Sequence, residues 1–458
     1  MDQVIIAVDV GTSSLKAGAV DERGKLLNWV RVPLIDGSEG PLETQSVSIW
    51  LEALRTAFRR LPEGKRAAAL AISGNGPTIV PVDARGNALD EASLWLNKND
   101  VRIEGQPSFF LPKIAWLAQK KPEVYKRTRW FFGCPEYLSF ILTGEPAAFY
   151  PSDEFLPYIW DRKGTEAYQL DERKLPGMVK CGQSLGTVLP SAAREFHLPQ
   201  DIPVVATGAD FLMSLIGTAV TAAGRTCDRA GTSEGINCCL EHKIDHPRIR
   251  CLPHAVEGLY NIAGILASTG RIFEWFRQFS GQQNRNYYDM LAEIEAVRWK
   301  SDLPHFYPSL HRGAVWEFSR GIFTNLEAHH GSAEMGRAVV SSIGFGVRDL
   351  IETLEGQGCR IESLRISGGQ GRNNIWNQMK ADMTGKVIEV PHIIDAELAG
   401  NAAAAYTAMG AYSSVSDAAE AIVRIDRRFE PNIPRYKTYS GEYSDYRVRC
   451  ARIIDALN

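Results

Sequence analysis

The chain has 458 residues, of which 45% are hydrophobic and 23% are charged, and its formal net charge at pH 7 is −3. This length predicts two large domains, and the balanced charge, with no lysine- or arginine-rich run, argues against nucleic acid or a membrane surface as a partner. No apolar run reaches the roughly 18 residues of a membrane helix. The eight cysteines lack C-x-x-C spacing, so we expect reduced thiols in a cytoplasmic protein.

Hydrophobic periodicity places the first elements of the chain. The predicted elements are strands at 3–10, 14–20, 25–32 and 67–73 and helices at 46–61, 111–120 and 134–143. The first three strands follow one another through short turns, which predicts an antiparallel start to the first sheet. The nine histidines are not grouped in a metal-binding pattern.

The first turn has an unusual composition. Asp9 ends a buried strand and is followed by Gly11-Thr12-Ser13, with Lys16 in the next strand. Backbone N–H groups of such a turn can converge on an anion, and Lys16 can meet a phosphate as a point charge. Asp9 then stands where the hydration shell of Mg²⁺ needs a carboxylate. The alternative is an ordinary hairpin turn, which glycine and serine also favour.

Two internal repeats indicate a duplicated chain. Gly11-Thr12-Ser13 recurs as Gly231-Thr232-Ser233, and RAAALAISG at 66–74 matches RIESLRISG at 360–368 in the same order. We therefore expect domains at 1–222 and 223–458, each carrying one glycine turn. Two facing domains with matching turns would hold a polyphosphate from both sides.

Other phosphate and catalytic motifs compete with this interpretation. The chain has no G-x-x-x-x-G-K-[ST] and no G-x-G-x-x-G, which argues against a P-loop protein and a Rossmann dehydrogenase. Residues 231–235 do match G-x-S-x-G, the nucleophile elbow of α/β-hydrolases. That elbow needs a helix after its serine, whereas a β-like run follows here, so we disfavour a hydrolase.

Asp210 is the candidate general base. It follows the strand-like run that ends at Thr207-Gly208 and opens an apolar helical segment. A helix N-cap and a general base both fit this position. Further on, glycines at 367–385 and the alanine-rich stretch 389–410 permit close approach to a flat ligand such as adenine, or tight helix packing.

Taken in order, these segments resemble the FGGY carbohydrate kinases, a branch of the actin-like ATPase superfamily. The similarity covers nearly the whole chain. The segments that carry it are VDVGTSSLKAGAVDERG, LETQSVSIWLEAL, FFLPKIAWLAQKKPEVYKR, AGTSEG, SRGIFTNLEAHHGSAEMGRAVVSSIGFGVRDLIETL and SGGQGRNNIWNQMKADMTGKVIEVP. In the fifth segment Asn325 stands where the family usually has glycine.

The resemblance implies an α/β fold of two actin-like (ribonuclease H-like) domains related by duplication, with an inter-domain cleft. It implies an enzyme that uses ATP and Mg²⁺ to phosphorylate a hydroxyl of a sugar, ketose or polyol, with Asp210 as general base. Asp9 and Asp210 match the positions near the metal. The positions that match nucleotide contacts are Gly11, Thr12, Ser13, Lys16, Gly231, Thr232, Gly368, Gly369, Gln370 and Asn374.

The acceptor side departs from the family pattern. Many members carry W-x-D-x-R, whereas Trp95 is followed here by Asn97 and Asn99, and Gly76-Pro77 replaces the polar pairs of xylulose and glycerol kinases. The expected substrate-binding residues are Asn75, Gly76, Pro77, Trp95, Asp210 and Phe211. The altered motif leaves open a second interpretation, an ATP-binding sensor or pseudokinase without activity. A homodimer is also possible.

Overall fold

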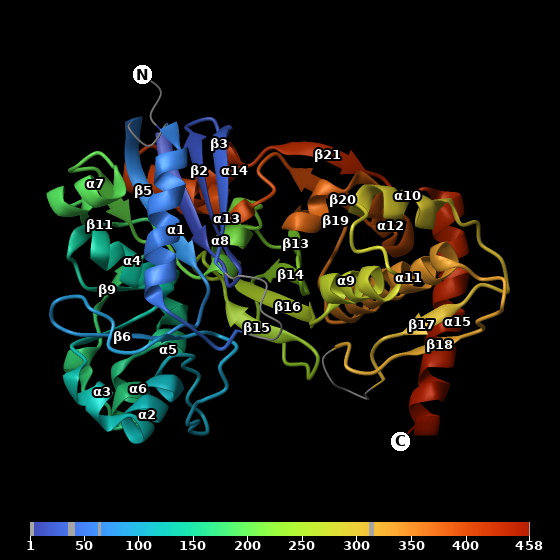
Figure 1. The fold of residues 1–458 in the computed structure, drawn as a ribbon, viewed down its shortest axis with the longest axis horizontal. Coiled ribbons are helices and arrows are strands. Elements are labelled where there is room, and N and C mark those ends of the chain that lie inside the picture. Colours follow the sequence, from blue (N-terminus) through green and yellow to red (C-terminus); the bar gives the residue numbers. More distant parts are fainter. Residues whose placement is uncertain (1–3, 35–41, 63–65, 311–315, 458) are drawn as a thin grey trace. The chain divides into compact units, whose positions relative to one another are not determined.

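The computed structural model describes residues 4–34, 42–62, 66–310 and 316–457, which form two compact units (Figure 1). Unit 1 contains residues 1–221, 253–258 and 396–424, and unit 2 contains residues 222–252, 259–395 and 425–458. Residues 396–424 therefore belong to unit 1 although they follow most of unit 2 in the sequence. The division into domains at residue 222 stays a prediction.

Unit 1 is built on a six-stranded mixed sheet in the order β11-β12-β5-β1-β2-β3. Its strands are β1 (Val4–Val10), β2 (Ser14–Asp21), β3 (Leu26–Pro33), β5 (Ala67–Gly74), β11 (Ser184–Thr187) and β12 (Pro203–Val205). Strand β1 is buried along its whole length, as expected for a central strand covered on both faces.

Helices cover both faces of this sheet. The helices of unit 1 are α1 (Val47–Arg60), α2 (Leu111–Lys120), α3 (Pro122–Arg127), α4 (Cys134–Thr143), α5 (Leu156–Ile159), α6 (Arg162–Ala167), α7 (Pro190–Phe196), α8 (Asp210–Gly217), α13 (Ala396–Ala408) and α14 (Val415–Ile422). Short strands complete the unit: β4 (Thr44–Gln45), β6 (Val80–Val82), β7 (Ala92–Ser93), β8 (Trp130–Phe132), β9 (Ala147–Tyr150) and β10 (Gly177–Lys180).

Alternation along β1 assigns its side chains to two faces. Val4, Ile6, Val8 and Val10 join the core that contains Trp50 of α1. Asp9 lies between two of these valines and therefore points to the opposite face, which is the face bonded by α13 through Asn401. This alternation places a carboxylate on the α13 side of the sheet.

Unit 2 contains a seven-stranded sheet in the order β15-β16-β14-β13-β19-β20-β21. Its strands are β13 (Thr226–Ala230), β14 (Glu234–Leu240), β15 (Arg250–Pro253), β16 (Tyr260–Leu266), β19 (Ser363–Ser367), β20 (Val387–Pro391) and β21 (Ile425–Phe429). The short pair β17 (His305–Tyr307) and β18 (Ile322–Thr324) stands apart from this sheet.

The helices of unit 2 pack on this sheet and on one another. They are α9 (Thr269–Phe279), α10 (Tyr287–Ala296), α11 (Ser332–Glu355), α12 (Asn374–Thr384) and α15 (Ile433–Leu457), with a 3₁₀ turn, η4, at Gly369–Arg372. Leu350 and Ile351 of α11 join the core of the sheet strands, and tyrosines of α15 join a second core with α9 and α10. None of the described helices is long and apolar enough to cross a membrane.

The repeats found in the sequence occupy equivalent strands of the two sheets. In unit 1 the order β3-β2-β1-β5-β12 has two antiparallel pairings followed by two parallel ones. In unit 2 the order β16-β14-β13-β19-β20 has the same sequence of directions. The two Gly-Thr-Ser turns join β1 to β2 and β13 to β14, and the two matching nonapeptides contain β5 and β19. The predicted actin-like fold with an internal repeat is confirmed.

Most predicted elements form with ends shifted by one or two residues. The helix predicted at 46–61 is α1, with Ser46 as its N-cap, and the helices predicted at 111–120 and 134–143 are α2 and α4. Residue 3 of the first predicted strand lies outside the described residues. All eight cysteines are free thiols.

Asn325 provides a test of local backbone strain. Its φ is 56°, in the left-handed region that favours glycine, and its side-chain amide donates to the carbonyl of Leu303 at 3.1 Å. Asn325→Ala and Asn325→Gly both lose that hydrogen bond, but only alanine keeps a Cβ. We expect the alanine variant to be less stable than the glycine variant by about 1 kcal/mol in urea unfolding. Equal stabilities would show that the backbone relaxes out of this conformation.

Candidate functional site

Asp9 is the most buried carboxylate of the predicted set, with 3% exposure. Its Oδ1 accepts a hydrogen bond from Ser73 Oγ at 2.9 Å, and its Oδ2 lies 3.9 Å from Lys16 Nζ. The pKa of Asp9 is raised to about 7, mainly by burial and also by the negative charges of Glu397 and Asp210, while Lys16 and the hydrogen bond from Ser73 act in the opposite direction. This environment disfavours a bare negative charge and would be relieved by a cation.

Two residues of this environment were missed by the sequence interpretation. Asn401 of α13 donates through Nδ2 to the carbonyl of Val8 at 2.7 Å and to Ser73 Oγ at 2.9 Å. Glu397 lies one helical turn before Asn401, and its buried Oε2 has no hydrogen-bond partner among the described residues. Both residues lie more than 380 positions from Asp9, so no local pattern could have pointed to them.

The first Gly-Thr-Ser turn is held by backbone bonds on both sides. The N–H of Gly11 donates to the carbonyl of Ser14 at 3.1 Å, and the N–H of Leu34 donates to the carbonyl of Ser13 at 2.9 Å. Trp95 Nε1 donates to Thr12 Oγ1 at 3.1 Å, while nearly half of the indole stays exposed. The structure therefore joins a predicted substrate residue directly to a predicted phosphate-contacting residue.

The residues after β5 approach the same turn. Asn75 donates through its backbone N–H and its Nδ2 to the carbonyl of Val10, at 2.8 and 3.1 Å. Next in the chain, a Cβ added at Gly76 would lie 3.3 Å from the Cβ of Ala209. Gly74 also forms a parallel bridge with Ala209. These contacts bring the 75–77 segment, with its cis Gly76–Pro77 peptide, beside the residue that precedes Asp210.

Asp210 is the first residue of α8 and is half-buried. The N-cap of this helix is Ala209, so the interpretation of Asp210 as the N-cap is wrong. Its Oδ1 accepts a hydrogen bond from the N–H of Phe211 at 2.6 Å, which fixes the carboxylate at the start of the helix. A carboxylate there also gains from the partial positive charge of the helix N-terminus.

Lys113 explains how the Trp95 loop keeps its shape. Its ammonium is 6% exposed and donates to the carbonyls of Leu94 and Asn97, at 3.1 and 2.5 Å. The Oδ1 of Asn97 accepts from the N–H of Asn99 at 2.8 Å, so this amide is used within the loop. Burial lowers the pKa of Lys113. The loop that departs from W-x-D-x-R is therefore folded, and the buried Lys113 bonds to its backbone.

In unit 2 the second Gly-Thr-Ser turn is exposed and closely approached by backbone. The N–H of Gly231 donates to the carbonyl of Ser233 at 2.9 Å, and the N–H groups of Gly270 and Arg271 donate to the carbonyl of Thr232 at 3.2 and 3.3 Å. Strand β14, not a helix, begins directly after Ser233. The nucleophile-elbow geometry is therefore absent at this turn.

The glycine motif after β19 lies against this second turn. Gly368 has a φ of 96°, and a Cβ there would lie 2.6 Å from the carbonyl oxygen of Ala230, so only glycine fits. Gln370 Nε2 donates to the carbonyl of Gly231 at 3.1 Å. Gly369 opens the η4 turn, and the Oδ1 of Asn374 accepts from Arg427. Unit 2 thus brings its predicted nucleotide residues together.

Most of the alanine-rich stretch packs as a helix. Residues 396–408 form α13, which belongs to unit 1, whereas the carbonyl of Ile394, earlier in the same stretch, accepts a hydrogen bond from the N–H of Gly368 at 3.0 Å. A Cβ added at Gly217 of α8 would lie 1.7 Å from the carbonyl oxygen of Ala396, and one at Gly400 would lie 2.0 Å from that of Met213. Small residues here allow the backbones of α8 and α13 to touch. Of the two roles proposed for these small residues, tight helix packing is therefore the one seen between α8 and α13.

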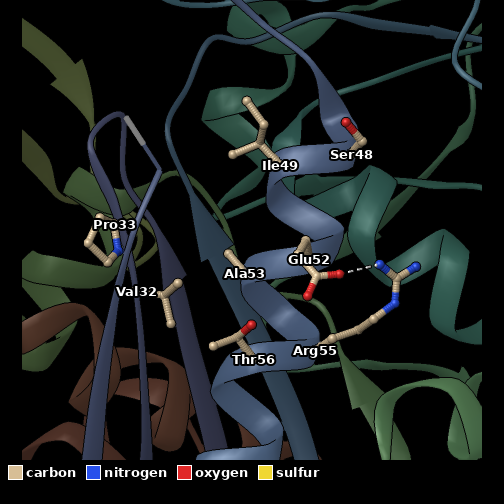
Figure 2. A pocket seen from close by; sticks show the side chains of 8 residues that line it. All are labelled: Val32, Pro33, Ser48, Ile49, Glu52, Ala53, Arg55 and Thr56. Carbon is tan, nitrogen blue, oxygen red and sulfur yellow. Dashed lines mark hydrogen bonds and ion pairs between the residues drawn. The ribbon is translucent and has the colours of Figure 1, made fainter. Parts of the chain in front are cut away.

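Two other features lie outside the predicted site. A surface hollow of about 490 Å³ between β3 and α1 includes the Glu52–Arg55 ion pair and shares no residue with the predicted set (Figure 2). Asp302, His329 and His330 offer ligand atoms within 4.8 Å of one another, so the expectation of ungrouped histidines is wrong here. His330 Nδ1 already accepts from the N–H of Glu327 at 3.0 Å, and His329 is largely exposed.

Comparisons with known proteins identify the family and the fold. The C-terminal and N-terminal domains of the FGGY family of carbohydrate kinases match residues 229–409 and 98–217. The xylulose kinase of Staphylococcus epidermidis is 26% identical, over 97% of this chain and 96% of its own length. Crystal structures of xylulose kinase from Rhodospirillum rubrum and gluconate kinase from Lactobacillus acidophilus each share 20% identity, with TM-scores of 0.80 and 0.82. The alignments cover 98% and 99% of this chain and 99% of each of those chains, and show the shared fold.

The raised pKa of Asp9 predicts how stability depends on pH. The folded state holds this proton up to about pH 7, while the unfolded value is 3.8, so wild-type stability falls as pH rises between these values. Asp9→Asn mimics the protonated form. In urea unfolding with EDTA, the variant should match the wild type near pH 4 and exceed it by up to about 4 kcal/mol at pH 8. Parallel pH profiles for the two proteins would contradict this environment for Asp9.

Proposed function

We propose a mechanism and site for this chain, which belongs to the FGGY family of carbohydrate kinases. The chain is a phosphotransferase that uses ATP to phosphorylate a carbohydrate hydroxyl. The observation that carries the site is the grouping in unit 1 of Asp9, the first glycine turn, the 75–77 segment and Asp210. This grouping offers an acid–base carboxylate, a cationic side chain and backbone N–H donors together.

In this proposal Asp210 is the general base. It accepts the proton of the acceptor hydroxyl as that oxygen attacks the γ-phosphorus of ATP, and the bond to the β-phosphate oxygen breaks. The carboxylate is half-buried and oriented by the N–H of Phe211. A fixed orientation at the helix start favours proton transfer in one geometry.

Asp9 and Asp210 would hold Mg²⁺, directly or through its water shell. Carboxylate oxygens are the ligands this ion prefers, and Asp9 is a buried carboxylate with Lys16 Nζ at 3.9 Å. The orphaned Oε2 of Glu397 on the same side of β1 also fits a cationic environment. When bound, the ion supplies positive charge to the β- and γ-phosphate oxygens.

Two sets of residues, one in each unit, are assigned to the nucleotide. In unit 1, Gly11 forms the turn, Thr12 and Ser13 offer hydroxyls, and Lys16 offers an ammonium to phosphate oxygens. In unit 2, Gly231 and Thr232 offer a second exposed turn. Gly368, Gly369, Gln370 and Asn374 are assigned to the nucleoside, because a Cβ at Gly369 would meet no atom within 4 Å, which leaves room for a flat ring.

The acceptor would lie against Asn75, Gly76, Pro77, Trp95 and Phe211. The half-exposed indole of Trp95 gives an apolar surface suited to the C–H face of a sugar. Its Nε1 is already bonded to Thr12, so the indole position is set by the phosphate turn. Fewer charged partners than in W-x-D-x-R members favour a ketose or polyol held by neutral hydrogen bonds.

The homodimer and the cytoplasmic location stay predictions.

Asp210 provides the test of the proposal. Asp210→Asn should reduce kcat by on the order of 10²-fold or more, because the amide cannot accept the hydroxyl proton, while the Kd for ATP changes little. ADP release would be measured across xylulose, gluconate, glycerol and other pentuloses and polyols, and ATP binding by calorimetry. Asp245→Asn, at an exposed carboxylate, is the control.

Unchanged turnover in Asp210→Asn would refute the base assignment. ATP binding by the wild type without turnover on any substrate of a wide panel would instead favour the non-catalytic interpretation. No observation on the described residues favours that interpretation.

A further inference from the structure

Lys380 is a fully buried lysine that lies between two buried carboxylates. Its Nζ donates to Asp228 Oδ2 at 2.6 Å and to Glu234 Oε1 at 2.5 Å, and the three side chains are at most 1% exposed. The sequence analysis did not single out any of them. We refer to Asp228, Glu234 and Lys380 as the buried charge triad.

The two carboxylates of the triad lie on the two strands that flank the second Gly-Thr-Ser turn. Asp228 lies on β13, three residues before Gly231, and Glu234 is the first residue of β14, directly after Ser233. The two strands pair in this region, with Ala230 opposite Glu234. One ammonium on α12 therefore bonds to the strand that enters the turn and to the strand that leaves it.

A second set of contacts links the same helix to the turn itself. Trp376 lies one helical turn before Lys380, and its ring centroid is 5.4 Å from Lys380 Nζ. Trp376 Nε1 donates to Gln370 Oε1 at 2.7 Å, and Gln370 Nε2 donates to the carbonyl of Gly231 at 3.1 Å. Helix α12 thus fixes both the base of the turn and its first residue.

The electrostatics of the triad argue against a role in stability alone. The pKa of Asp228 is raised to about 8, mainly by burial and also by the charge of Glu234, while Lys380 acts in the opposite direction. The second oxygens, Asp228 Oδ1 and Glu234 Oε2, are buried and accept no hydrogen bond from described residues. Buried ionic groups with unsatisfied oxygens are often no more stabilising than well-packed neutral residues. What such a group does provide is a fixed geometry.

We propose that Lys380 is a positioning residue that holds Gly231-Thr232-Ser233 in the conformation that binds the phosphates of ATP. It acts through Asp228 and Glu234, which set the ends of the two strands, and it does not contact the nucleotide. The inference rests on the nucleotide role of this turn in the proposed function. Loss of the triad therefore weakens ATP binding and leaves the affinity for the sugar unchanged.

The test replaces charges while keeping side-chain size. Lys380→Met alone leaves two buried carboxylates without a counterion and is unsuitable because it threatens folding. The main variant is Asp228→Asn/Glu234→Gln/Lys380→Met, which buries no charge. Glu234→Gln alone and Asp228→Asn alone each leave a balanced pair with Lys380 and provide the second line of evidence. The control is Arg337→Met/Glu442→Gln, which neutralises another buried pair of unit 2, bonded at 2.7 and 3.2 Å.

The measurements are the melting temperature, the Kd for ATP by calorimetry, and KM for ATP and for the sugar. We expect the triad variant to keep a cooperative melting transition and to bind ATP on the order of tenfold more weakly, with a matching rise in KM for ATP. The two single variants should show smaller losses in the same direction. KM for the sugar, and the ATP affinity of the control, should stay within twofold of wild type.

ATP affinity at the wild-type level in the folded triad variant, or in both single variants, would overturn the positioning role. An equal loss in the control would also overturn it, because it would trace the effect to general destabilisation. A wild type that binds no ATP would refute the proposed function itself, which separates that failure from a failure of this inference.

Discussion

A buried charge beneath a short turn is the constraint on which both halves of this protein depend. Each turn closes through one backbone bond, from the N–H of Gly11 to the carbonyl of Ser14 and from the N–H of Gly231 to the carbonyl of Ser233, so the rest of its shape depends on the groups packed beneath it. In unit 1 Asp9 lies beneath the first turn and is bonded by Ser73, with Lys16 at 3.9 Å. In unit 2 Lys380 bonds the strands on either side of the second turn. The duplicated strands have the same order and directions, but the ionisable group beneath the first turn is an acid, Asp9, and the central group beneath the second turn is a base, Lys380.

Close backbone approach is the second requirement of the site. Gly76 against Ala209, Gly368 against Ala230, and Gly217 against Ala396 are contacts at which an added Cβ would lie 1.7–3.3 Å from a neighbouring atom. The first contact brings the 75–77 segment to Asp210, and the second brings the 368–371 turn to the second Gly-Thr-Ser turn. The third seats α13 on α8 and places Glu397 on the side of the sheet that carries Asp9. Glycine and alanine at these points turn distant segments into neighbours.

The sequence analysis succeeded where a signal was local. The two Gly-Thr-Ser turns, the paired nonapeptides and the position of Asp210 at the start of a helix each depend on a few neighbouring residues, and the structure contains the corresponding elements. It failed where a role depended on a partner far along the chain. Lys380 lies 152 and 146 positions from Asp228 and Glu234, and nothing in the helical pattern of α12 distinguishes a buried lysine from a solvated one. The grouping of His329 with Asp302 was missed for the same reason.

The sequence by itself determined the duplicated strand order, the two turns and the class of chemistry, because strand alternation, glycine turns and motif order are encoded in short stretches. Only the tertiary structure decided which charges are buried together and which helix covers Asp9. It also showed that residues 396–408 of the alanine-rich stretch form α13 and pack against α8. The physical reason is that the free energy of a buried charge depends on every group within several ångströms, and folding chooses those groups from all parts of the chain.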